Sequence, residues 1–128
     1  SIILITHDLG IVAGLCSRVI VMYGGKIVES GSVYDIYEHP QHPYTWGLLG
    51  SVPRLDSKTK GKLVPIPGTP PDLLNPPQGC GFAPRCRHCM RICTEQKPEY
   101  TMIKEGHQVA CWLQHPQAPK VVGLEGRM

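Results

Sequence analysis

The sequence predicts an α+β fold followed by an irregular extension whose cysteines bind a metal centre. Three observations support this prediction. An apolar run at residues 1–5 precedes helix-like spacing of apolar residues, two β-branched runs flank a Gly-Gly pair at 24–25, and four cysteines lie within residues 79–93. The 128 residues are enough for one domain of ordinary size or two very small ones.

Composition and charge narrow the class of protein. The chain has 13 prolines, 14 glycines, 6% aromatic residues and a net charge of +3 without long runs of like charge, which is weak evidence for a nucleic-acid surface. Its apolar stretches are far shorter than the roughly 20 residues that span a bilayer, and its start does not resemble a secretory signal. It begins as a strand without an initiating Met, so we expect a piece of a longer protein that does not itself cross a membrane.

The first 16 residues predict a strand and a helix. Residues 1–5 are an isoleucine-rich run, typical of a strand that is buried on both faces in a parallel sheet. Asp8 can accept hydrogen bonds from the first amides of a helix over residues 9–16, where the apolar residues share one face. His7 would therefore lie between a buried strand and a helix, at the edge of the sheet where ligands bind in open α/β folds.

A β-hairpin and two short helices are predicted next. The β-branched runs of residues 18–31 are joined by the Gly-Gly pair at 24–25, and such a two-residue turn needs the positive φ that glycine adopts. Ser32 with an acid at Asp35 forms a capping box that opens one short helix. Pro43 suits the first position of the other.

The chain divides into four segments. Residues 1–52 carry the regular elements, residues 53–79 form a proline-rich connector, residues 80–115 form the cysteine-bearing extension, and residues 116–128 form a flexible tail. We expect irregular backbone in the extension.

Five cysteines crowd the extension. Five residues separate Cys80 from Cys86, two separate Cys86 from Cys89, three separate Cys89 from Cys93, and seventeen separate Cys93 from Cys111. Such spacing lets several thiolates converge, either on a metal centre or in a disulfide network. Because disulfides need an oxidising compartment and nothing in the sequence indicates export, a metal centre is favoured.

The spacing alone leaves the metal open. Zinc sites usually combine two C-x2-C knuckles, and only Cys86 with Cys89 forms one. A four-iron four-sulfur cluster also takes four thiolates and tolerates more varied spacing. Five cysteines compete for four positions, and the spacing does not identify the spare one. His88 and His107 could replace a thiolate, but we interpret them as imidazoles on the surface beside basic residues.

Three stretches together carry a resemblance to a known family. The resemblance to the final part of an ABC-transporter nucleotide-binding domain is carried by SIILITHDLGIVAGLCSRVIVMYGGKIVESG, in which His7 occupies the position of the switch histidine. The His-Pro-Tyr signature of the oligopeptide, dipeptide and nickel transporter ATPases is similar to HPQHPYTWGLLGSVP. The cysteine-bearing C-terminal extension of that subfamily resembles GCGFAPRC together with QVACWL. The resemblance implies the C-terminal piece of an α/β P-loop nucleotide-binding domain.

The resemblance also implies the roles of particular residues. His7 would contact the γ-phosphate of ATP and help to orient the attacking water, and a neutral imidazole that donates a hydrogen bond would stabilise charge on the transferred group. Cys89 falls where the family usually has a non-ligand. The ligand positions of members that carry a four-iron four-sulfur cluster match Cys80, Cys86, Cys93 and Cys111.

For the whole protein, the resemblance implies the ATPase subunit of an importer of peptides or a related solute, with ATP and Mg as its ligands. It would be peripheral, at the cytoplasmic face of the cell (inner) membrane. Its partners would be a second ATPase subunit, two transmembrane permeases and an extracytoplasmic solute-binding protein, with no nucleic acid among them. The sequence holds no G-x-x-x-x-G-K-[ST] loop, so we expect this chain alone not to hydrolyse ATP.

A different class of protein is the alternative. A small zinc module that binds nucleic acid or protein would also gather cysteines in a short loop. The modest net charge and the sparse aromatic residues disfavour it. Zinc in place of iron is the corresponding alternative for the cofactor.

Overall fold

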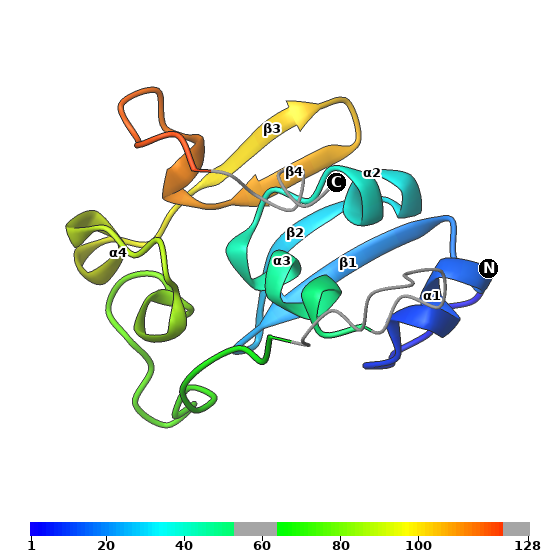
Figure 1. Ribbon diagram of the computed structural model, residues 1–128, viewed down its shortest axis with the longest axis horizontal. Helices are drawn as coiled ribbons and strands as arrows, with labels where there is room; N and C mark the ends of the chain where they lie inside the picture. Colours follow the sequence, from blue (N-terminus) through cyan, green and yellow to red (C-terminus); the bar gives the residue numbers. More distant parts are fainter. Residues whose placement is uncertain (53–63, 122–128) are drawn as a thin grey trace.

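A computed structural model describes residues 1–52 and 64–121. Its centre is a four-stranded antiparallel sheet with the strand order β1-β2-β4-β3 (Figure 1). The fold is therefore α+β, as the sequence predicts. Residues 53–63 of the predicted connector and 122–128 of the predicted tail lie outside the described residues. The strands are β1 (Arg18–Tyr23), β2 (Lys26–Ser32), β3 (Tyr100–Lys104) and β4 (His107–Ala110).

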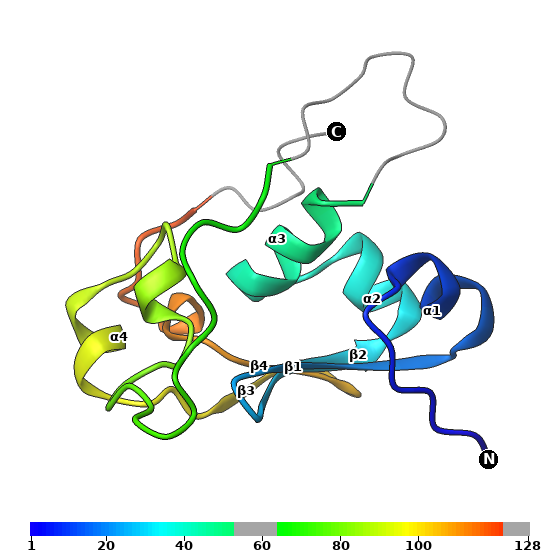
Figure 2. The ribbon, with the colours of Figure 1, turned by 90° about the horizontal axis from the view of Figure 1, so that it is seen from below.

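The helices form two groups around the sheet. Three of them cover one face (Figure 2), and the short helices of the extension gather at one end of the sheet. In the part of the chain that the structure describes, no helix is long and apolar enough to span a membrane. The first group is α1 (Leu9–Leu15), α2 (Val33–Glu38) and α3 (Pro43–Gly50), and the second is η1 (Ala83–Arg85), α4 (Arg91–Glu95) and η2 (Trp112–Gln114).

Burial of one sheet face produces the core. In β1, buried residues alternate with exposed ones, as the two-residue period of a strand requires. Phe82 of the extension joins this core, because its ring lies edge-on to that of Tyr23 with centroids 5.1 Å apart. The extension thus packs on the same core as the first half of the chain. The core cluster contains Val12, Val19, Val21, Tyr23, Val28, Ile36 and Phe82.

The predicted hairpin and the first predicted helix are confirmed. Asp8 Oδ1 accepts hydrogen bonds from the backbone amides of Gly10 at 2.9 Å and Ile11 at 3.2 Å, which satisfies amides that α1 leaves unpaired. Gly24 and Gly25 have φ angles of 56° and 77°, the conformation that a tight turn between twisted strands needs.

Both helices predicted after the hairpin are also confirmed. Ser32 Oγ accepts from the Asp35 amide at 3.1 Å, and Asp35 Oδ2 accepts from the Ser32 amide at 3.2 Å, so the capping box of α2 is complete. Lys104 from β3 places its Nζ 2.5 Å from Asp35 Oδ1. Pro43 is the first residue of α3, and His42 is its N-cap.

The predicted strand at residues 1–5 is wrong. The structure leaves this run without regular structure, and its isoleucines at positions 2, 3 and 5 are at least 90% exposed. A strand forms when a neighbour pairs its N–H and C=O groups. Among the described residues no strand pairs with this run, so its backbone N–H and C=O groups have no neighbouring strand to bond with.

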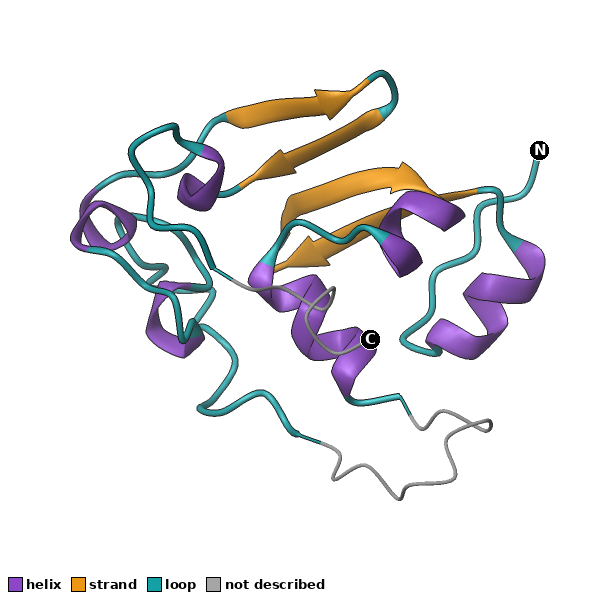
Figure 3. Cartoon of the chain, turned by 45° about the horizontal axis from the view of Figure 1, so that its top comes forward, coloured by secondary structure: helices purple, strands orange, loops and turns teal. Residues whose placement is uncertain are grey.

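The prediction of an irregular extension is wrong for residues 100–110. They form the hairpin of β3 and β4, with Gly106 at a φ of 81° in the turn, and β4 pairs with β2 through Glu29 opposite Val109. A long-range strand pairing of this kind has no local signature in the sequence. It joins the extension directly to the first half of the chain (Figure 3).

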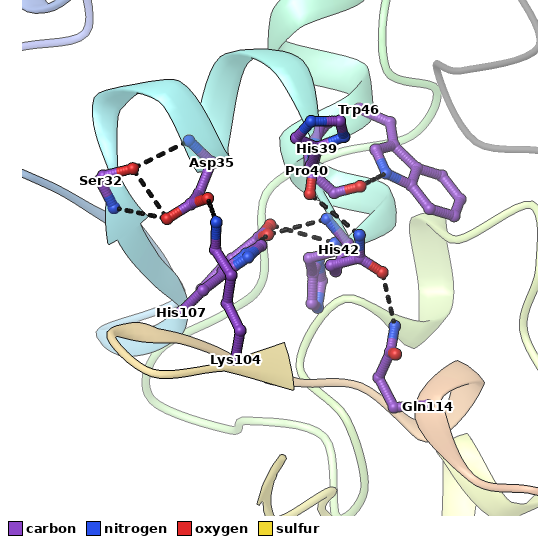
Figure 4. A network of polar contacts seen from close by, with 11 residues as sticks. Ser32, Asp35, His39, Pro40, His42, Trp46, Lys104, His107 and Gln114 are labelled. Carbon is purple, nitrogen blue, oxygen red and sulfur yellow. Dashed lines mark hydrogen bonds and ion pairs between the residues drawn. The ribbon is translucent and has the colours of Figure 1, made fainter. Parts of the chain in front are cut away.

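A buried carboxylate holds this joint together. Glu29 is fully buried and its two oxygens accept hydrogen bonds from the backbone amides of Gln41 at 2.8 Å and His42 at 3.1 Å. His107 Nε2 donates to Glu29 Oε1 at 2.8 Å. Figure 4 shows His107 and His42 within one network of polar contacts. The expectation of a surface imidazole at His107 is therefore wrong, because its ring is 1% exposed and pairs with this carboxylate.

Replacement of Glu29 tests the importance of this joint. Glu29→Ala would leave two backbone amides and a buried imidazole without their acceptor, so we expect the free energy of unfolding to fall by about 3–5 kcal/mol. Glu29→Gln keeps one acceptor oxygen and should cost about 1–3 kcal/mol. Urea unfolding of the chain measures both values. Glu105→Gln, on the exposed β3–β4 turn, is the matched control, and equal stability of Glu29→Ala and this control would contradict the assignment.

The capping box predicts a pH dependence. Hydrogen bonding by the Lys104 ammonium, and then by the Ser32 hydroxyl, lowers the pKa of Asp35 from 3.8 to about 2. A carboxyl whose pKa is lower in the folded state stabilises the fold above its unfolded pKa, and this stabilisation disappears as the pH falls to the folded pKa. The stability lost in Asp35→Asn should therefore be constant above about pH 5 and shrink between about pH 4 and pH 2.

The measurement is urea unfolding of Asp35→Asn and the unsubstituted chain across that pH range. Lys104→Met removes the ammonium and leaves the capping box, so its stability difference should also shrink with falling pH but start from a smaller value. A gap between Asp35→Asn and the unsubstituted chain that stays constant down to pH 2 would rule out the role of the Asp35 carboxylate.

Candidate functional site

A cavity of about 20 Å³ lies where the extension meets the start of α3. Four of its lining residues are Cys80, Cys86, Cys93 and Cys111, the ligand set that the family resemblance implies, whereas Cys89 does not line it. The other lining residues are His42, Pro43, Phe82, Ala83, His88, Trp112 and Leu113.

A close backbone contact brings the first and third cysteines together. The Cys80 amide donates to the Cys93 carbonyl at 2.7 Å. Gly79 makes this contact possible, because a Cβ atom at position 79 would lie 2.2 Å from the same carbonyl oxygen. Only glycine therefore fits at position 79 without a shift of the backbone.

Short helices place Cys86 and Cys93, and the sheet places Cys111. The turn η1 carries the chain from Cys80 to Cys86 through hydrogen bonds of the Ala83 amide to Cys80 and of the Cys86 amide to Ala83. The helix α4 holds Cys93, whose Sγ accepts from the Met90 amide at 3.5 Å. Cys111 follows β4 and is the N-cap of η2, so the sheet itself brings the most distant cysteine to the cavity.

Burial and the nearby thiols raise the pKa of three of the lining cysteines, Cys80, Cys86 and Cys111. Burial, followed by the nearby thiols of the cluster, raises the pKa of Cys86 to about 11 and that of Cys111 to about 12. Burial also raises the pKa of Cys80. Repulsion from the three other lining thiols contributes at Cys111. Thiolates are the form that binds metals, so a cation that binds here must displace protons.

The donor types that line the cavity are those of a metal–thiolate centre. Four thiols from two separate segments line it, and among the described residues no carboxylate does. Thiolates are the ligands of iron–sulfur clusters and of structural zinc. In the described ranges 1–52 and 64–121, no three His, Cys, Asp or Glu side chains are arranged to hold a single metal ion. All six cysteines are free thiols.

Cys89 differs from the four lining cysteines. Its side chain is exposed, and its Sγ donates to the Met90 carbonyl at 3.6 Å. Burial, followed by the proximity of Cys93 and Cys80, raises its pKa. It therefore lies near the cluster of thiols without lining the cavity.

Two imidazoles also line the cavity. His42 is 1% exposed, and burial lowers its pKa to about 4, which keeps the ring neutral. Its Nδ1 accepts from the Tyr44 amide at 3.0 Å as the N-cap of α3. His88 is half-buried, and its ring lies edge-on to Trp46 with centroids 5.6 Å apart.

His7 lies apart from the cysteines. It is exposed in the bend that precedes α1, and α1 and the short helices of the extension lie at opposite ends of the sheet in Figures 1 and 2. The two sites predicted from the sequence are therefore separate places on the molecule.

Sequence reasoning missed Glu29 and His42. A glutamate within a β-branched strand was the available signal for Glu29, because a charged residue in such a strand is buried only with a partner. For His42, its position directly before Pro43 marks it as a helix N-cap. Neither signal identifies the donors to Glu29 or the cavity that His42 lines, because both depend on residues that are distant in the sequence.

Comparisons with known proteins found a family model and several relatives that match this chain. A family model described as "Oligopeptide/dipeptide transporter, C-terminal region" matches residues 28–93. The chain is 55% identical to the oligopeptide transport ATP-binding protein OppD of Bacillus subtilis over 94% of its length, and 54% identical to the dipeptide transport ATP-binding protein DppD of Lactococcus lactis over 94%. It is 53% identical to OppD of Salmonella typhimurium over 77%. The chain covers 34%, 34% and 29% of these relatives, about a third of their length.

Proposed function

This chain belongs to the family of oligopeptide/dipeptide transporter C-terminal regions, and from that membership we propose that it is the C-terminal part of an ATPase subunit that couples ATP hydrolysis to the import of peptides or a related solute. The observation that carries the proposal is the match to the family model across residues 28–93, which include three of the four cysteines that line the cavity. In this proposal one end of the molecule serves the nucleotide and the other end holds a metal–thiolate centre.

We assign the nucleotide role to His7. Its imidazole would donate a hydrogen bond to the transferred phosphoryl group of ATP, and positioning supplies most of the catalysis in such reactions. The local backbone supports the assignment, because the Asp8 amide donates to Thr6 Oγ1 at 3.0 Å and Asp8 caps α1. These bonds fix the chain on either side of His7 and leave its ring exposed.

We assign a four-iron four-sulfur cluster, with zinc as the alternative, to the four lining cysteines. When bound, such a centre supplies covalent links between segments of the chain and so contributes free energy of folding. The residues themselves provide the rest: Gly79 permits the close approach of two ligand segments, and β4 carries Cys111 to the others. The centre is proposed to fasten the extension to the sheet. The four ligands are Cys80, Cys86, Cys93 and Cys111.

The whole protein would act with partners that this chain does not contain. These are a second ATPase subunit, two transmembrane permeases and an extracytoplasmic solute-binding protein, with the subunit peripheral at the cytoplasmic face of the membrane. ATP and Mg would bind the whole subunit, since the 128 residues of this chain contain no phosphate-binding loop.

Replacement of His7 tests the nucleotide role. In the whole subunit, His7→Ala should leave ATP binding nearly unchanged and lower the rate of hydrolysis by roughly 100-fold or more, because a donor to the developing charge is lost. Nucleotide binding and steady-state turnover are measured separately. His115→Ala, another exposed histidine, is the control, and unchanged turnover in His7→Ala would contradict the assignment.

A pair of cysteine variants tests the ligand set. We expect Cys111→Ser to lose bound metal and to loosen the extension, and Cys89→Ser to do neither, because only Cys111 lines the cavity. The measurements are iron, sulfide and zinc content and the visible spectrum of the whole subunit purified without air. Equal metal retention in the two variants would overturn the choice of ligands, and zinc without iron or colour would establish the alternative metal.

A further inference from the structure

The imidazole of His42 has one hydrogen-bond partner for its two nitrogens. Its Nδ1 accepts from the Tyr44 amide at 3.0 Å, whereas its Nε2 is buried and has no partner in the part of the chain that the structure describes. Buried polar atoms are nearly always hydrogen-bonded, so an orphan of this kind calls for an explanation.

The N-cap bond fixes the tautomer of the ring. Because Nδ1 accepts a hydrogen bond, it carries no proton, and the proton of the neutral imidazole is on Nε2. The orphan atom is therefore a donor. An N–H group buried without an acceptor is unfavourable, so a group that is absent from the chain itself is the expected acceptor.

The cavity lining indicates what this acceptor is. His42 lines the same cavity as the four cysteines, and most of the other lining residues are apolar. The indole of Trp112 is a donor only and already donates to the Gln96 carbonyl at 2.9 Å. His88 packs against Trp46. The four cysteine sulfur atoms are therefore the most numerous acceptors in the lining. A thiolate or sulfide bound to a metal is a stronger acceptor than a thiol, because it carries negative charge.

We propose that His42 Nε2–H donates a hydrogen bond to a sulfur atom of the metal–thiolate centre held by the four lining cysteines. This inference rests on the proposed function and adds a positioning residue to it. The backbone amide of His42 donates to Glu29 Oε2 at 3.1 Å, so the buried carboxylate at the sheet joint holds the imidazole beside the centre. The sheet and the centre are thereby linked through one residue.

The hydrogen bond has a measurable consequence. Hydrogen bonds to the sulfur atoms of an iron–sulfur cluster are among the properties that set its reduction potential. A donor stabilises the reduced form most, because that form carries one more negative charge. Loss of the donor should therefore shift the midpoint potential to more negative values.

Two variants separate the donor from the helix cap. His42→Asn keeps an acceptor at the position of Nδ1, so the cap remains, but it places no N–H at the position of Nε2. His42→Gln places an amide N–H near the position of Nε2 and loses the cap acceptor. His115→Gln, at an exposed position, is the matched control.

The experiment is a redox titration of the whole subunit, purified without air, with the iron content measured for every variant. Electron–nuclear double resonance of the reduced cluster, before and after exchange into D2O, detects the exchangeable proton. We expect a more negative midpoint potential and loss of this proton coupling in His42→Asn. Both properties should be close to the unsubstituted values in His42→Gln, although its thermal stability should fall more because the cap is lost.

Two alternative outcomes would contradict the inference, and a third would contradict the proposed cluster. An unchanged potential and proton coupling in His42→Asn, with full iron content, would mean that water or another group satisfies Nε2, and the inference would be overturned. Loss of iron from both variants would overturn it as well, because only the cap or the packing would then matter. A subunit without His42 substitutions that holds no iron would overturn the proposed cluster itself, and the iron analysis distinguishes this result from the others.

Discussion

The structure depends on one buried carboxylate. Glu29 sits in β2 without exposure to solvent and accepts hydrogen bonds from three groups that are distant in the sequence, namely two backbone amides of the segment before α3 and the imidazole of His107 in β4. An ionised group in such a place is tolerated only when its oxygens are satisfied. Because the donors come from two separate segments, the one before α3 and β4, this requirement fixes how β2, β4 and α3 are assembled.

The same constraint extends to the cysteines. β4 pairs with β2 and ends directly before Cys111, while His42 receives its position from Glu29 and begins α3 at the cavity. Cys111 and His42 therefore reach the cavity through the sheet and Glu29. Cys80, Cys86 and Cys93 reach it through local structure, namely the close approach at Gly79 and the short helices η1 and α4. The cavity exists only where the local turns and the long-range pairing meet.

Sequence reasoning succeeded where the signal was local. Asp8 beside a run of apolar residues, the Gly-Gly pair, the capping box of Ser32 and Asp35, and Pro43 each specify backbone geometry within a few residues, and each element formed as expected. Sequence reasoning failed where the formation of a strand depended on pairing with a segment that is distant in the sequence. Residues 1–5 have the composition of a strand, but no strand among the described residues pairs with them. The hairpin of β3 and β4 joins the sheet because β4 pairs with β2, which is distant in the sequence.

The sequence by itself determined the helix caps, the β1–β2 turn and the resemblance that marked four cysteines out of five, because these depend on residue types at fixed spacing. Only the tertiary structure decided that the extension completes the sheet, that His107 is buried against Glu29, and that His42 faces the thiols. The physical reason is the same in each case. Burial of a polar group is favourable only when a partner reaches it, and which partner does so is set by the folding of the whole chain, not by the residues on either side.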